Sequence, residues 1–95
     1  MPSSTARVAT DAAARYAKQL ASHLSHKMDV SDRPEGGFNL VMTSGEGVLI
    51  PEATQLVMHA SAVDAELLAR VQDVLGRHLE RFGQRKELTV TWEDD

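Results

Sequence analysis

The sequence contains no cysteine, which excludes disulfide bonds, thiolate metal ligands and a cysteine nucleophile. It also lacks an apolar run of the roughly 20 residues that a helix needs to cross a bilayer. The first ten residues, MPSSTARVAT, have no apolar segment of the kind found in a secretory signal peptide. These absences predict a cytoplasmic protein with no membrane partner.

Aromatic residues are scarce, at 4% of the chain, and acidic residues outnumber basic ones. Ten Lys and Arg against 14 Asp and Glu give a formal net charge of −4. The phosphate backbone of nucleic acids favours clustered Lys and Arg, and single strands are bound on aromatic stacking platforms. The composition therefore argues against a nucleic-acid partner.

Common catalytic and nucleotide-binding motifs are missing as well. The sequence has no G-x-G-x-x-G, Walker A, G-x-S-x-G or H-E-x-x-H pattern. Its carboxylates are scattered and do not suggest an acid–base pair. Motifs therefore leave open whether the protein is an enzyme.

Two segments have the apolar spacing of amphipathic helices. The first is predicted over residues 11–25, with Thr10 as a plausible N-cap and apolar positions at Ala13, Tyr16, Ala17, Leu20 and Leu24. The second is predicted from an N-cap at Ser61 to a C-cap at Gly83, with apolar positions at Val63, Leu67, Leu68, Val71, Val74, Leu75, His78, Leu79 and Phe82.

The segment between these helices alternates polar and apolar residues and is punctuated by glycine and proline, as in a meander of short antiparallel strands. We predict a weak strand at 27–31, three strands within 38–59, and a last strand in ELTVTW at 87–92. The order is helix, four strands, helix, strand. The predicted fold class is α+β: a two-layer sandwich in which two helices pack on one face of an antiparallel sheet.

The length of 95 residues fits a single domain spanning residues 1–95. Residues 1–9 are small and polar, and we expect them to be partly disordered, with Arg7 and Val8 docking. Residues 93–95, EDD, are expected to form a flexible, solvated tail.

Three histidines are the most informative polar residues. His23 and His26 close the first predicted helix, and His78 lies on the apolar stripe of the second. Imidazole ligates metals and transfers protons near neutral pH. If the helix ends meet, His23, His26 and His78 form a metal site that favours a borderline divalent transition ion. In the alternative interpretation, His78 is a buried structural histidine, and His23 and His26 complement the helix C-terminus.

Two further features of the second helix have open interpretations. Arg77 and Arg81 share a helix face suited to binding an anionic ligand, or they form a solvated face in which Asp73 pairs with Arg77. Gly76 lies inside the helix, where glycine costs roughly 1 kcal/mol relative to alanine. Close approach of a second chain in a homodimer would explain Gly76, and so would simple tolerance.

Two stretches of the chain, RYAKQLASHLSHK at 15–27 and GRHLERFGQRKELTVTW at 76–92, resemble the characteristic blocks of domain-of-unknown-function family 2218. The intervening segment also fits, so the resemblance covers nearly the whole chain. It implies a small bacterial α+β domain and no assigned activity. Some members are joined to, or encoded beside, proteins of siderophore and iron uptake, which implies an iron-uptake partner. The flavin-reductase part of such fusions is absent here.

The leading hypothesis is a non-enzymatic binding or accessory module that holds a metal or a small anionic metal chelate. His23, His26 and His78 would supply the metal ligands, and Arg81 and Arg77 would contact the anion. Two alternatives remain: a homodimeric interaction domain, and a small-substrate enzyme that uses the histidines for acid–base chemistry.

Overall fold

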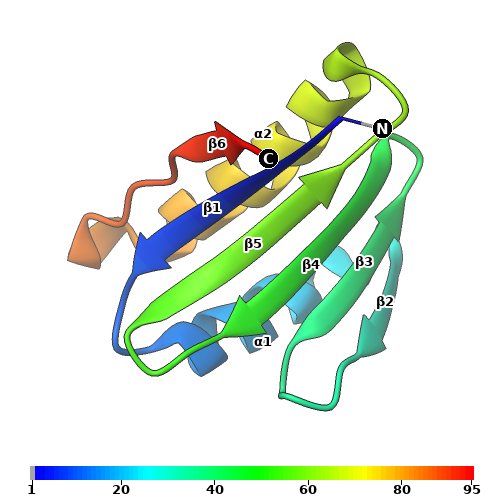
Figure 1. Cartoon of the computed structure of the whole chain (residues 1–95). Helices are drawn as coiled ribbons and strands as arrows, with labels where there is room; N and C mark the ends of the chain where they lie inside the picture. The colour runs from blue at the N-terminus through cyan, green and yellow to red at the C-terminus, as the bar shows by residue number, and fades with distance from the viewer. Residues whose placement is uncertain (1) are drawn as a thin grey trace.

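The molecule is built around a six-stranded sheet in which every neighbouring pair is antiparallel, in the order β2-β3-β4-β5-β1-β6 (Figure 1). The computed structural model describes residues 2–95. The elements in chain order are β1 Ser3–Ala9, α1 Ala13–Leu24, β2 Asp29–Asp32, β3 Phe38–Met42, β4 Gly45–Pro51, β5 Gln55–Ser61, α2 Ala65–Phe82, the short 3-10 helix η1 Gln84–Lys86, and β6 Trp92–Asp94.

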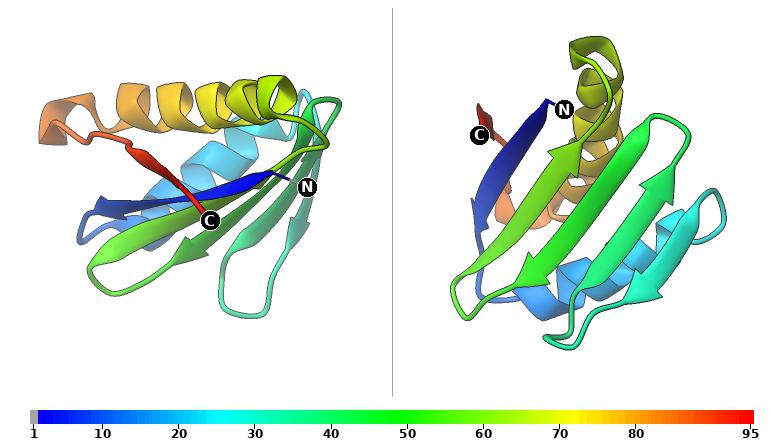
Figure 2. Two further views of the ribbon diagram at one scale, coloured as in Figure 1. Left: turned by 45° about the horizontal axis from the view of Figure 1, so that its top comes forward. Right: turned by 45° about the vertical axis from the view of Figure 1, so that its right-hand side comes forward.

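Both long helices cover the same face of the sheet, and the other face has no covering layer (Figure 2). The predicted α+β class, with two helices on one side of an antiparallel sheet, is therefore confirmed. Within residues 2–95, no helix is both long enough and apolar enough to cross a membrane.

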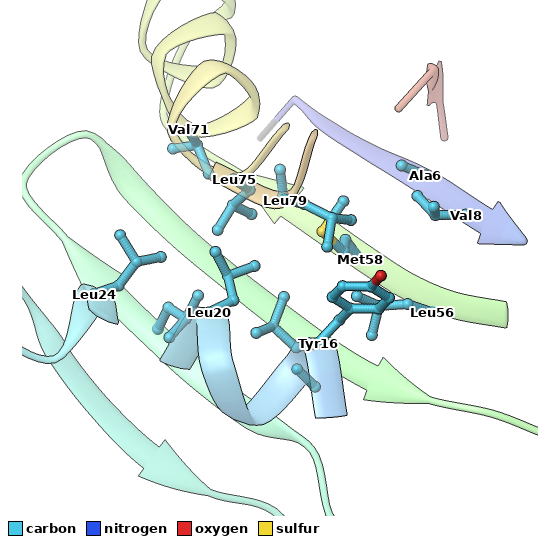
Figure 3. Packing of buried hydrophobic residues seen from close by; sticks show 14 of the residues in the cluster. Ala6, Val8, Tyr16, Leu20, Leu24, Leu56, Met58, Val71, Leu75 and Leu79 are labelled. Atoms are coloured by element: carbon cyan, nitrogen blue, oxygen red, sulfur yellow. The ribbon is translucent and has the colours of Figure 1, made fainter. Parts of the chain in front are cut away.

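The core lies between the helices and the sheet, and the strand register puts it there. Alternate residues of each strand face the helices, so that Leu49 on β4 pairs with Met58 on β5, and both are fully buried. From the helix side, Leu20 on α1 and Leu75 on α2 complete the same cluster (Figure 3). The core is almost entirely aliphatic, as the low aromatic content requires.

The helix boundaries differ slightly from the predicted ones because the caps differ. The N-cap of α2 is Asp64 rather than Ser61, and its carboxylate accepts a hydrogen bond from the Leu67 amide at 2.8 Å. Ser61 instead ends strand β5. Gly83 is the C-cap, as predicted, and its amide donates to the carbonyl of Leu79.

The prediction that residues 1–9 are partly disordered is wrong for the described residues 2–9. Residues 3–9 form β1, an inner strand between β5 and β6. Ser4, Ala6 and Val8 face the helices and are buried. Because several side chains of β1 are small or hydroxylated, its alternation of buried and exposed positions does not appear in the hydrophobicity pattern. The small Ser4 side chain fits closely under α2, where Gln72 donates a hydrogen bond to it. Met1 lies outside the described residues.

The end of the chain also differs from prediction. Residues 88–91 are not in a strand, and β6 comprises Trp92–Asp94, which includes part of the predicted solvated tail. The hydroxyls of Ser3 and Thr5 donate to the carboxylate of Asp95, at 2.9 and 2.7 Å. Side-chain hydrogen bonds from β1 therefore hold the end of the segment 93–95, which its polar sequence had predicted to be a flexible tail.

Gly76 needs no second chain to explain it. It is buried beneath residues 88–92 of the same chain, and a Cβ atom at this position would lie 3.5 Å from both the Trp92 indole nitrogen and a Val90 methyl. Gly76 is thus a tolerated glycine at the position where Val90 and Trp92 of the same chain pack across α2.

Candidate functional site

The last turn of α1 and the second half of α2 bring His23 and His78 together. Because the two helices pack against each other on one face of the sheet, residues 55 positions apart become neighbours. The ring centroids of the two imidazoles lie 5.0 Å apart, and the planes are inclined at 46°. Both imidazoles lie beside Phe82, whose ring centroid is 5.5 Å from that of His23 and 6.5 Å from that of His78.

The hydrogen bond of His78 fixes which of its nitrogens is free. Its Nδ1 lies 2.6 Å from the carbonyl oxygen of Val74, one turn earlier in α2. A carbonyl oxygen only accepts, so Nδ1 carries the proton and donates it. In the neutral ring Nε2 then presents a lone pair. Metal-bound histidines commonly show this arrangement, in which the second nitrogen donates to a backbone carbonyl.

The surroundings of His23 favour its neutral form. The side chain is exposed, yet partial desolvation where it meets its neighbours is the main cause that lowers its pKa below the ordinary 6.5. The positive charges of His78, Lys27, His26 and Arg81 lower the pKa further. His23 therefore also offers an unprotonated imidazole at neutral pH.

The other predicted site residues surround this pair. His26 is exposed just beyond the end of α1, and it acts on His23 through charge. Arg77, His78 and Arg81 line a hollow of about 260 Å³. Arg77 pairs with Asp73 at 2.8 Å, as its alternative interpretation predicted. No ion pair involves Arg81 in the described part of the chain.

A complete protein-only metal site is not formed by these residues. Among residues 2–95, no three His, Cys, Asp or Glu side chains are grouped so that they could hold a metal ion. The structure thus provides two neighbouring imidazoles with positive charges around them, and the remaining ligands of a metal ion would have to come from the molecule that carries the ion.

One polar arrangement was missed by the sequence analysis. On the uncovered face of the sheet, the Thr5 hydroxyl donates to Asp95, so it accepts the Nδ1–H of His59 at 2.9 Å. The Thr5 and Ser3 hydroxyls hold the pKa of Asp95 below its usual range, aided by the charges of His59 and Arg7. The sequence could have indicated this Thr5–His59–Asp95 arrangement only if β1 had been recognised as a strand paired with β5, and the small residues of β1 concealed that strand.

Comparisons with known proteins give a consistent result. The family model described as "Uncharacterized protein conserved in bacteria (DUF2218)" matches residues 5–93. A solved structure, the NMR structure of PA4090 from Pseudomonas aeruginosa, is 30% identical, with a TM-score of 0.81 over 98% of this chain and 96% of that one. No curated protein matches the chain. Since the match spans almost all of the sequence and the fold agrees with that of the solved structure, the chain belongs to the bacterial family DUF2218.

Proposed function

We propose that the protein is a non-enzymatic binding module for a small anionic chelate of a transition metal. His23 and His78 would fill two coordination positions of the metal, and the chelate would supply the others. The observation that carries the proposal is the approach of two imidazoles, at a centroid distance of 5.0 Å, from two separate helices.

The distance suits two imidazoles that share one ion. Metal–nitrogen bonds of about 2.0–2.1 Å place the centroids of two converging imidazoles about 4.5–5.2 Å apart, for angles between octahedral and tetrahedral. The observed separation lies inside this range. The separation of the rings is thus compatible with a shared ion, which requires Nε2 of His78 and one nitrogen of His23 to face that ion.

The positive charges around His23 favour a metal bound in an anionic chelate over a bare metal cation. Lys27 and Arg81 carry positive charges close enough to His23 to lower its pKa. A bare divalent cation is repelled by these groups, whereas a negatively charged chelate is attracted. Imidazole favours a borderline transition ion over calcium or magnesium. Iron–siderophore handling, with an iron-uptake partner protein, is the physiological context that such a ligand fits.

Nickel(II) nitrilotriacetate is a direct probe, because it is anionic and leaves two coordination positions open. We expect calorimetric titration to show one complex bound per chain. His23→Ala and His78→Ala should each weaken binding by at least about 10–100-fold, since loss of a direct ligand costs no less than loss of a residue that only orients a ligand. Arg81→Gln and Lys27→Gln should each weaken it about 2–5-fold, because they remove exposed charges.

Two controls separate this site from general histidine affinity. His59→Ala alters a histidine on the opposite face of the sheet and should leave binding unchanged. Nickel(II) diethylenetriamine, which is cationic, should bind much more weakly than the nitrilotriacetate complex. The proposal is wrong if His78→Ala has no effect while His26→Ala abolishes binding, because the ligands would then be His23 and His26 of one helix end.

The dependence on pH gives a second prediction. Coordination requires unprotonated imidazoles, and the pKa of His23 lies below 6.5. When the pH is lowered from 8, binding of the nickel complex should weaken as His23 becomes protonated, approaching about tenfold per pH unit for each proton that competes. An anion held by charge alone would bind more tightly as the histidines become protonated. Titrations of wild-type protein across this range distinguish the two modes.

A further inference from the structure

A second concave region lies between α1 and the β2–β3 hairpin, away from the histidine pair. It is a hollow of about 520 Å³, within the range typical of small-molecule sites. Its apolar lining comes from Ala21 of α1, Val30 of β2, Pro34 of the turn and Phe38 of β3. Neither His23 nor His78 contributes to it, so it is independent of the proposed metal-chelate site.

The hairpin wall of this hollow is already formed. The Arg33 amide donates to the Gly37 carbonyl at 2.9 Å, and the Gly36 amide donates back to the Arg33 carbonyl at 3.1 Å. Gly36 has a φ of 83°, which favours glycine. At Gly37 a Cβ atom would lie 2.1 Å from the carbonyl oxygen of Leu49, so the hairpin packs directly on β4. The hairpin side of the hollow therefore has a defined conformation before any ligand binds.

Two charges at the hollow have no ion-pair partner among residues 2–95. Arg33 is engaged, since it bonds Glu35 and donates to the Asn39 side chain at 2.9 Å. Lys18 on the helix wall and Asp32 on the strand wall are both exposed and take part in no ion pair in the described residues. The hollow thus presents one free positive charge, one free negative charge and an apolar floor.

We propose that this hollow binds a small zwitterion with a bulky apolar side chain, namely an apolar α-amino acid. The carboxylate would face Lys18, the ammonium group would face Asp32, and the side chain would enter the apolar floor beside Phe38. Because Phe38 is only half-buried, an aromatic side chain can contact its ring. L-phenylalanine matches all three features and is the probe of choice.

The test is a titration of isotope-labelled protein with L-phenylalanine, followed by NMR chemical shifts. We expect saturable shifts confined to α1 and residues 29–42, with affinity in the millimolar range or better. Two analogues that each keep the ring and one charge, 2-phenylethylamine and 3-phenylpropanoate, should bind about tenfold more weakly.

Two exposed-residue variants assign each charge. Lys18→Gln should remove the advantage of L-phenylalanine over 2-phenylethylamine, and Asp32→Asn should remove its advantage over 3-phenylpropanoate. Lys86→Gln, which changes a lysine of η1 that does not line this hollow, should alter neither. The proposal is overturned if L-phenylalanine does not saturate, if either analogue binds as tightly as the amino acid, or if the shifts lie outside the two walls.

Discussion

Replacing Leu20 by alanine should lower the free energy of unfolding by about 2–5 kcal/mol, a large part of the stability of a domain of this size. Leu20 is 0% exposed in the middle of α1, where it packs between the sheet and α2 (Figure 3). Truncation removes its buried methyl groups and leaves a cavity that the rigid sheet cannot close. Denaturant unfolding followed by circular dichroism measures the loss.

Two companion variants define the cause of the Leu20 effect. Leu20→Met keeps the volume and should cost less than about 1.5 kcal/mol. Val63→Ala alters a side chain that is 71% exposed and should stay within about 0.5 kcal/mol of wild type. A Leu20→Ala protein as stable as Val63→Ala would show that α1 is not packed on the sheet as described. The position of His23, which lies in α1, would then also be wrong.

Gly45→Ala should be almost as harmful, at about 2–5 kcal/mol, although it adds only one methyl group. Gly45 begins β4 with a φ of 157°, where side chains are rare. A Cβ atom there would lie 2.2 Å from the carbonyl oxygen of Ser61 and 3.1 Å from a methyl group of Val71. The backbone of β4 must move away from β5 or α2 to make room.

The matched control for Gly45 is the same substitution at Gly76. A Cβ atom at Gly76 meets its neighbours at 3.5 Å, which is ordinary contact, and alanine favours the helix by roughly 1 kcal/mol. Gly76→Ala should therefore equal or slightly exceed wild type in thermal stability. If both variants lose stability equally, the steric clash described at Gly45 does not set the cost of the substitution there.

Much of the fold could be predicted because the relevant signals are local. Apolar spacing predicts helices over 11–25 and from Ser61 to Gly83, close to the observed Ala13–Leu24 and Ala65–Phe82, and Gly83 marks the end of the second. Alternation in 38–42 and 55–61 defines strands. Strand β1 could not be recognised, since Ser4 and Ala6 give little apolar signal and are buried only because β1 lies inside the sheet, with these side chains facing the helices.

The candidate site divides in the same way. The spacing of His23 from His26 and the place of His78 on the apolar stripe are properties of the sequence, and they were enough to select these residues. Their separation of 5.0 Å is not, because it depends on how far along the sheet each helix is packed. The two unpaired charges at the second hollow, Lys18 and Asp32, are likewise ordinary surface residues in the sequence.

The sequence by itself determined the class of protein: an aliphatic-cored α+β domain without thiol chemistry, with two helices, predicted at 11–25 and 61–83, and histidines near their ends. These features follow from side-chain type and period, which act over a few residues. Only the tertiary structure decided that residues 3–9 form an inner strand, that residues 88–92 cover Gly76, and that His23 meets His78. Each of these depends on contacts between segments far apart in the chain, and no local pattern encodes which segments will meet.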